Sequence, residues 1–186
     1  VGTHVVKQAL QQGNSVTAFT RSADKMSGLS HPALSIITGH LLSSASVENA
    51  IKGHSAVICT IGDGRKGKVR AAGTKNIIHA MHKTGVKRLI CQSTLGAGDS
   101  KANLNFFWKH IMFGFLLKDA YKDHEEQEKY VFDSSLDWTI VRPGAFTDGE
   151  VTNNYKVGFD GSVKNLSLKI SKADIANFLL KQVKSD

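Results

Sequence analysis

An α/β fold with a doubly wound parallel sheet is predicted by two features of this 186-residue sequence. Strand-like and helix-like segments alternate along the chain, which is typical of βαβ units. The strand-like segments are near-continuous apolar runs, and such strands are buried by helices on both faces of a sheet. No repeat, low-complexity stretch or linker interrupts the alternation, so we expect a single domain over residues 1–186.

Local patterns place the individual elements. Helices are indicated by apolar side chains on one face, often followed by glycine, and strands by runs rich in β-branched and aromatic residues. The predicted helices cover residues 3–13, 44–53, 69–85, 104–118, 120–134 and 172–183, and the predicted strands cover 15–20, 33–37, 55–62, 86–93, 136–143 and 166–170. This fold normally begins with a central strand, so we expect an additional strand and a glycine turn, roughly a dozen residues, before the first helix.

Composition narrows the class of protein. The hydrophobic fraction of 41% and the charged fraction of 22% are those of a globular chain. Cys59 and Cys91 lie in apolar runs, which favours buried reduced thiols over a disulfide or a metal site and indicates the cytoplasm. No segment supplies the roughly 20 apolar residues that a membrane span needs.

The net charge of +8 favours anionic partners. The basic residues are scattered, however, and no sheet motif combines aromatic and basic residues. We therefore expect no nucleic-acid partner and no membrane partner, and a monomer or weak homodimer.

A dinucleotide site is predicted where ligands bind such sheets, beyond the carboxyl ends of the strands. The N-terminus of the first helix, with Gly2 and Thr3, would bind the pyrophosphate. Arg21 stands after the strand 15–20, where an acidic residue would bind the ribose hydroxyls of NAD, with Ser22 and Lys25 beside it. This arrangement predicts recognition of the 2′-phosphate of NADP, the alternative being a solvated basic turn.

The segment after the strand 55–62 combines glycines with basic residues. Its glycines allow the backbone to approach a ligand closely. The basic residues either face phosphates or form a solvated loop. The glycines are Gly62, Gly64 and Gly67, and the basic residues are Arg65, Lys66, Lys68 and Arg70.

Six segments together resemble the atypical short-chain dehydrogenase/reductases of the NmrA-like group, and within them the NAD(P)H-dependent flavin and biliverdin-IXβ reductases. These are GTHVVKQAL (2–10), the arginine after the strand 15–20, GTKNIIHA (73–80), GVKRLICQST (85–94), KDHEEQE (122–128) and SSLDWTIVRPG (134–144). The last matches the group's S-G-L-x-x-T-I-x-R-P-G signature with one change, Ser135 in place of glycine.

The resemblance implies a Rossmann-type fold and a set of cofactor-binding residues. One of these departs from the family, since His40 stands where an aspartate usually flanks the adenine. The implied set is Gly2, Thr3, Arg21, Ser22, Lys25, His40, Leu41, Thr60, Ile61, Gly62, Gln92, Ser93, Pro143, Gly144 and Ala145.

The usual catalytic pair of the short-chain dehydrogenases, a tyrosine four residues before a lysine, is absent from the sequence. Aligning Glu128 with the family's glutamate puts His124 at the lysine and Ala120 at the tyrosine, with Tyr121 one residue off register. The resemblance implies catalytic roles for Ser93 and for His124, although His124 also fits a surface ion pair. Ordinary carbonyl reduction would lack its phenol donor.

A substrate region is expected over 95–120 and 144–165. Phe106, Phe107 and Trp108 would roof an apolar pocket for a planar acceptor, the alternatives being core packing, a dimer contact or a membrane contact. A histidine that the flavin reductases place near the substrate falls on Ala145, which weakens the tetrapyrrole assignment.

These expectations favour an NADPH-dependent oxidoreductase, with NADPH preferred over NADH, that reduces a flavin, quinone, tetrapyrrole or similar conjugated small molecule by hydride transfer. The alternative is a non-catalytic NADP(H)-binding sensor of the NmrA-like type, which the missing acid–base pair also fits.

Overall fold

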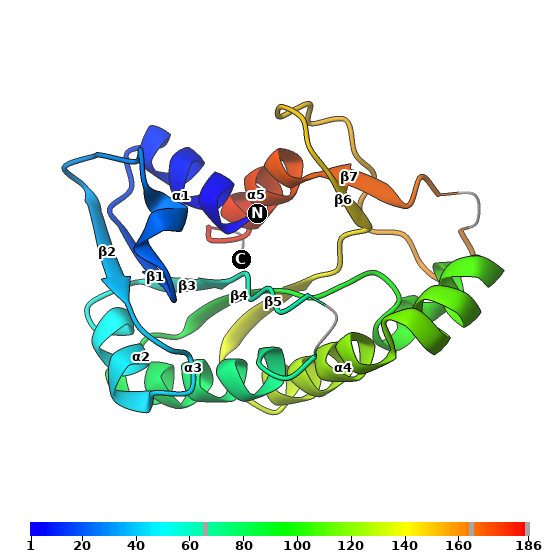
Figure 1. Ribbon diagram of the computed structural model, residues 1–186, viewed down its shortest axis with the longest axis horizontal. Coiled ribbons are helices and arrows are strands. Elements are labelled where there is room, and N and C mark those ends of the chain that lie inside the picture. Colours follow the sequence, from blue (N-terminus) through cyan, green and yellow to red (C-terminus); the bar gives the residue numbers. More distant parts are fainter. Residues whose placement is uncertain (65–66, 164–165, 185–186) are drawn as a thin grey trace.

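The computed structural model describes residues 1–64, 67–163 and 166–184 (Figure 1). All strand pairs are parallel, and they form sheets in the orders β1-β2, β3-β4-β5 and β6-β7. The strands are β1 (Val16–Thr20), β2 (Leu34–Thr38), β3 (Ala56–Cys59), β4 (Arg88–Gln92), β5 (Asp137–Val141), β6 (Ala145–Thr147) and β7 (Lys169–Ser171). The predicted α/β class with parallel strands is confirmed.

Helices cover both faces of the strands, as Figure 1 shows with α1 and α5 above and α2, α3 and α4 below. One apolar core joins α1 and α5 to the strands and includes Val5, Ile90 and Leu179. The other joins α2, α3 and α4 to the opposite face and includes Met81 and Leu89. The helices are α1 (Gly2–Gln11), α2 (Ser44–Ile51), α3 (Arg70–Thr84), α4 (Lys118–Phe132) and α5 (Lys172–Lys181).

The sheets β1-β2 and β3-β4-β5 are separate, because β1 and β3 form no ladder with each other in the described part of the chain. A cavity runs between them, lined by Thr17 on one side and by Val57 and Ile58 on the other. His54 Nε2 and Thr17 Oγ1, 2.8 Å apart, join the two sides.

The region between β4 and α4 departs from regular α/β geometry. The predicted helix 104–118 is instead a π-helix, η3 (Phe107–Leu116), in which Leu117 N–H donates to Met112 O at 2.7 Å. Two short 3₁₀ helices, η1 (Ala23–Met26) and η2 (Gly98–Asn103), and the strand β6 were not predicted. Among the described residues, no helix has the length and apolar character needed to cross a bilayer.

Candidate active site

A cavity of about 440 Å³ lies at the carboxyl ends of β1 and β3 and continues between the two strands. The N-terminus of α1 borders it, and a Cβ built on Gly2 would lie 3.0 Å from Thr60 Oγ1. Of the predicted cofactor-binding residues, the cavity is lined by Gly2, Thr3, Arg21, Lys25, Leu41, Thr60, Ile61 and Gly62. The structure therefore brings residues from four separate segments of the sequence to one cleft.

The hydrogen-bond donors and cations that border this cleft fit a dinucleotide. The first backbone donor within α1 is Val5 N–H, which bonds Val1 O, so the preceding N–H groups are available to an anion such as a pyrophosphate. Arg21 and Lys25 are exposed at the end of β1 and could meet a phosphate on the ribose. The glycine at position 2 keeps the helix N-terminus close to Thr60, leaving room for the ligand on the open side.

Several predicted cofactor-binding residues lie elsewhere. Ser22 bonds Asp24 through its hydroxyl, and His40 is exposed, with its Nδ1 accepting from Leu42 N–H. Gln92 is buried, and its Oε1 has no hydrogen-bond partner within the described ranges. None of these side chains lines the dinucleotide cavity.

The basic residues after β3 lie in different environments. Lys68 N–H donates to Asp63 Oδ2, which closes the loop on itself. Arg70 is buried, and both its backbone N–H and its guanidinium donate to Asp123 of α4. Arg65 and Lys66 lie outside the described residues.

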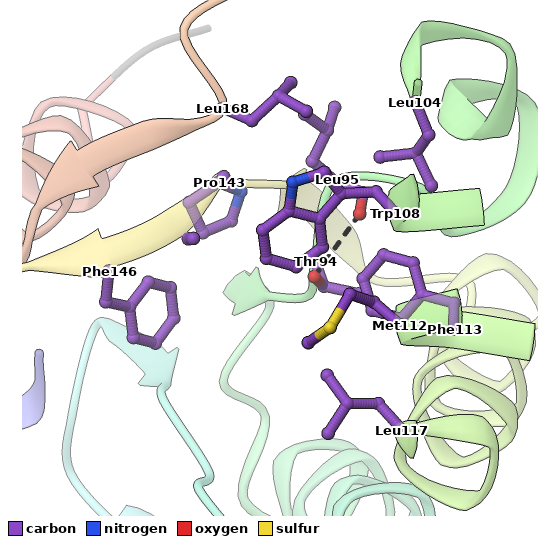
Figure 2. A pocket seen from close by; sticks show the side chains of 12 residues that line it. Thr94, Leu95, Leu104, Trp108, Met112, Phe113, Leu117, Pro143, Phe146 and Leu168 are labelled. Carbon is purple, nitrogen blue, oxygen red and sulfur yellow. Dashed lines mark hydrogen bonds between the residues drawn. The ribbon is translucent and has the colours of Figure 1, made fainter. Parts of the chain in front are cut away.

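A second cavity, of about 240 Å³, lies beyond β4 and β5 and is almost entirely apolar (Figure 2). Figure 2 shows Trp108, Met112 and Phe113 entering it from η3, opposite Pro143 and Phe146. No charged side chain lines it within the described chain. The lining residues are Thr94, Leu95, Leu104, Trp108, Met112, Phe113, Leu117, Pro143, Gly144, Ala145, Phe146 and Leu168.

The structure separates the three residues of the predicted aromatic roof. Trp108 lines the apolar pocket, whereas Phe106 and Phe107 are 73% and 51% exposed and lie outside it. Pro143, Gly144 and Ala145, expected beside the nicotinamide, line this pocket instead of the dinucleotide cleft. The three residues thus form part of the wall of the apolar pocket.

Strand register relates the two cavities. β4 pairs with β3 through Cys59 and Cys91, and with β5 through Gln92 and Val141. The carboxyl ends of these three strands therefore form a row along one edge, with Ser93 in the middle. Ser93 N–H donates to Val141 O, which fixes the turn that leads to Thr94.

Ser93 and His124, for which the resemblance implies catalytic roles, lie close together. Ser93 Oγ is 3.4 Å from His124 Nδ1, and Gln127 Oε1 is 3.3 Å from the same nitrogen. Gln127 Nε2 donates to Thr74 Oγ1 at 2.9 Å, so its Oε1 is left to accept from His124. His124 Nδ1 then carries the proton, and the Ser93 hydroxyl accepts from it and remains free to donate.

Ser93 is only 1% exposed, and neither cavity includes it in its wall, whereas its neighbour Thr94 lines the apolar pocket. A direct contact between Ser93 and a ligand thus stays a prediction. Thr94 is a polar wall residue that sequence reasoning did not single out. Gln127 and Thr74 were missed as well, because their contact joins residues 53 positions apart in the sequence.

Burial lowers the pKa of His124 to about 4, and the nearby Arg70 guanidinium acts in the same direction. The imidazole is therefore neutral at pH 7, and an imidazolium proton is not available there. Asp123 fixes the position of this segment, since its carboxylate accepts from the N–H groups of Arg70 and Ala71 at the start of α3. His124 is thus held as a neutral, oriented hydrogen-bonding group and not as a surface ion pair.

Tyr121 lies outside the lining of both cavities. Its hydroxyl donates to Gly96 O at 2.9 Å, and its ring lies 5.2 Å from that of Phe113. Burial, with Glu125 next in effect, raises its pKa to about 12. A phenol that is bonded to the backbone and hard to ionise braces the pocket wall and is a poor proton donor.

A buried ion pair holds the other side of the pocket. Arg142 donates to both oxygens of Glu128, at 2.9 and 2.7 Å, and the Glu128 side chain is 3% exposed. Glu128, followed by Asp99, raises the pKa of Arg142. Two residues further, Gly144 allows close packing, since a Cβ there would lie 2.7 Å from Leu168 O.

The fold and the dinucleotide cleft define an α/β nucleotide-binding protein. The chain matches the NAD(P)H-binding family over residues 1–186 and belongs to it. The expected membership among NAD(P)-binding proteins is confirmed at the level of this family, and a nicotinamide dinucleotide is the cofactor that the family binds.

Similar proteins agree with this assignment. The UPF0659 protein YMR090W of Saccharomyces cerevisiae is 27% identical over 145 residues, which cover 75% of this chain and 60% of that protein. The chain therefore spans less than two thirds of the length of this curated relative.

Two solved structures share the fold. An anaerobillin reductase, ChuY, from Escherichia coli O157:H7 has a TM-score of 0.76 at 22% identity, with 99% of this chain and 85% of that chain covered. A short-chain dehydrogenase/reductase from Veillonella parvula in complex with NADP has a TM-score of 0.81 at 14% identity, with 99% and 82% covered. At these identities the likeness extends to the fold alone.

Proposed function

We propose that the protein is an NADPH-dependent reductase of small, neutral, conjugated acceptors, such as a quinone or the isoalloxazine ring of a flavin. The observation that carries the proposal is the apolar pocket at the same strand edge as the dinucleotide cleft, with no charged lining residue in the described chain. A pocket of this kind binds apolar rings and repels charged groups, because burying an unpaired charge is costly.

The cofactor preference is part of the proposal. The exposed Arg21 and Lys25 border the cleft where the adenine ribose would lie, and they could neutralise a 2′-phosphate. The NADP complex of the Veillonella protein supports this choice only through the shared fold.

When bound, the nicotinamide supplies a hydride. The chain's residues would position the acceptor and exclude water from it, with Trp108 and Phe146 on opposite sides of the pocket. A conjugated acceptor spreads the negative charge that it receives, so solvent can supply the proton. This chemistry fits a site in which the Tyr121 hydroxyl is bonded to Gly96 and the imidazole of His124 is neutral.

A tetrapyrrole fits the pocket less well, although the name of the ChuY structure points to that class. The pocket of about 240 Å³ lies below the range usual for drug-sized ligands, and its walls offer no cation for a propionate. Only part of such a substrate could enter.

The test is the rate of NADPH oxidation with menadione, FMN or biliverdin as acceptor. We expect the highest kcat/KM with menadione, and we expect Trp108→Ala to lower that value by roughly tenfold or more through a raised KM. The other tryptophan, Trp138, packs on Phe132 outside the pocket, so Trp138→Ala is the matched control and should change little.

A non-catalytic sensor is the second candidate, favoured by the bonded Tyr121 hydroxyl and the neutral His124. Tight NADPH binding without turnover of any of the three acceptors would support the sensor and contradict the reductase.

A further inference from the structure

The π-helix η3 has two apolar faces. Because each π-helical hydrogen bond joins residues five apart, side chains four, five or nine positions apart share a face. The inner face lines the apolar pocket and consists of Trp108, Met112, Phe113 and Leu117. The outer face consists of Phe106, Phe107, Ile111, Phe115 and Leu116.

The outer face is exposed to an unusual degree. Phe115 is 80% exposed and Phe106 is 73% exposed, and the other three side chains are each more than 40% exposed. A contiguous cluster of large apolar side chains on a soluble surface marks an interaction site. Figure 1 shows η3 at the right-hand edge of the molecule, projecting away from both helical layers.

η3 and the residues that adjoin it are basic, with the exposed Asp99 and Asp119 at the two borders of this segment. Between Asp99 and Asp119 the sequence contains no acidic residue, and it contains Lys101, Lys109, His110 and Lys118. Lys109, His110 and Lys118 are exposed, and the whole chain carries a net charge of +8. An exposed apolar face flanked by cations is complementary to a surface that is apolar beneath anionic headgroups.

We propose that the outer face of η3 docks the protein on an anionic lipid bilayer, with the phenylalanines among the acyl chains and the lysines at the headgroups. This differs from the expectation of no membrane partner and follows the membrane contact that was one alternative for Phe106, Phe107 and Trp108; a helix lying in the interface needs no spanning segment. Since the inner face of the same helix lines the apolar pocket, docking would bring that pocket next to the membrane.

A second copy of the chain fits this face less well. A symmetric dimer through η3 would place the same lysines of both protomers near each other, and the two chains carry like net charges. The bilayer has neither disadvantage.

The experiment is flotation of the full-length protein with vesicles of phosphatidylcholine alone or mixed with phosphatidylglycerol, at low salt. We expect binding to the mixed vesicles and weak binding to the neutral ones. Phe106→Ser combined with Phe115→Ser should lower the partition coefficient by tenfold or more, and Lys109→Gln combined with Lys118→Gln should remove most of the preference for anionic vesicles.

The matched control combines Leu42→Ser with Val157→Ser, because both side chains are exposed, at 50% and 58%, and lie outside η3. This variant should float like the wild type. NADPH affinity and circular dichroism of each variant verify its fold, so the result does not depend on turnover or on the identity of the acceptor.

The proposal is overturned if the wild type does not float, if the Phe106/Phe115 variant floats equally well, or if the control loses binding to the same extent. It is also overturned if sedimentation without lipid shows a dimer that the Phe106/Phe115 variant dissolves, since a second copy would then cover the face.

Discussion

The nucleotide half of the molecule, built on β1, β2, β3 and α1, differs from the acceptor half, built on β5, β6, η3 and α4, in how its cavity is made. The nucleotide cleft combines helix N–H groups, glycines and exposed cations. The acceptor pocket is apolar, and Arg142, which precedes its wall residue Pro143, is paired with Glu128 and Asp99. The first cavity therefore suits a large anion, and the second suits a neutral ring that displaces water.

The largest difference between the halves should appear in stability. Glu128 and Arg142 form a buried ion pair in the acceptor half, whereas Glu48 and Lys83 form an exposed pair on α2 and α3. Glu128→Ala leaves the Arg142 guanidinium without its buried partner and should lower the free energy of unfolding by about 3 kcal/mol. Glu48→Ala should cost less than about 1 kcal/mol. Urea denaturation measures both, and equal losses would contradict the assigned role of the buried pair.

The pH dependence of stability tests the burial of His124. Its pKa is about 4 in the folded protein, below the usual value of 6.5 that applies to the unfolded chain. The unfolded state therefore binds more protons between these values, so this contribution to stability is complete above pH 6.5 and is lost as the pH falls toward 4. The full effect is roughly 3 kcal/mol.

The variant His124→Asn serves as the comparison, because its amide nitrogen can replace Nδ1 but does not titrate in this pH range. The free energy of unfolding of the wild type should fall more steeply with acidification than that of the variant. Parallel curves for the two proteins would mean that the imidazole is accessible to protons in the folded state.

The cofactor preference can be tested on the nucleotide half alone. Arg21→Ala should weaken NADPH binding by roughly tenfold or more, because a charge-assisted hydrogen bond is worth about 1.5–3 kcal/mol, and it should leave NADH binding nearly unchanged. Lys87→Ala removes a charge of the same sign at an exposed residue outside the cavity and is the control. Fluorescence titration with both cofactors decides the point, and equal losses for NADPH and NADH would remove the 2′-phosphate role.

The sequence predicted the nucleotide half better than the acceptor half, because the first is built from regular parallel strands and the second contains a π-helix. Strand ends such as Thr60 and Arg21 could be placed because regular parallel strands bring their carboxyl ends to one edge. The faces of η3 could not, since the segment is apolar on all sides and the pattern does not say which side faces inward. Phe106 and Phe107 face outward, and no helix places three consecutive residues on one face.

The inner contacts of α4 escaped prediction for a different reason. That Gln127 reaches Thr74, and that Asp123 caps α3, depends on how two helices pack and not on spacing along the chain. Ser93 and His124 were singled out by the resemblance, and the structure places Ser93 Oγ 3.4 Å from His124 Nδ1.

Proton supply is expected to be independent of the phenol in the acceptor half. Tyr121→Phe should leave the rate of acceptor reduction within about threefold, under roughly 1 kcal/mol of barrier, because the hydroxyl is bonded to Gly96 O. Ser93→Ala should lower this rate more than Tyr121→Phe does. Thr94→Val changes the pocket wall but not the buried serine, so comparing it with Ser93→Ala separates the two roles. Single-turnover rates with menadione give the comparison, and a hundredfold loss in Tyr121→Phe would restore the tyrosine as the acid.

The smallest expected effect concerns the one departure from the family signature, Ser135, which lies at the turn into β5. Ser135 has φ +54°, a left-handed conformation that disfavours a side chain, and it is exposed. Glycine removes that strain but has more freedom to lose on folding, so Ser135→Gly should raise the free energy of unfolding by only about 0.5–1 kcal/mol. Asn153 also has φ +54°, but its Oδ1 accepts from Lys181 Nζ and asparagine tolerates this conformation, so Asn153→Gly should give no gain. Thermal unfolding of the two variants side by side measures the contrast, and a loss of stability in Ser135→Gly would show that the serine side chain stabilises the turn.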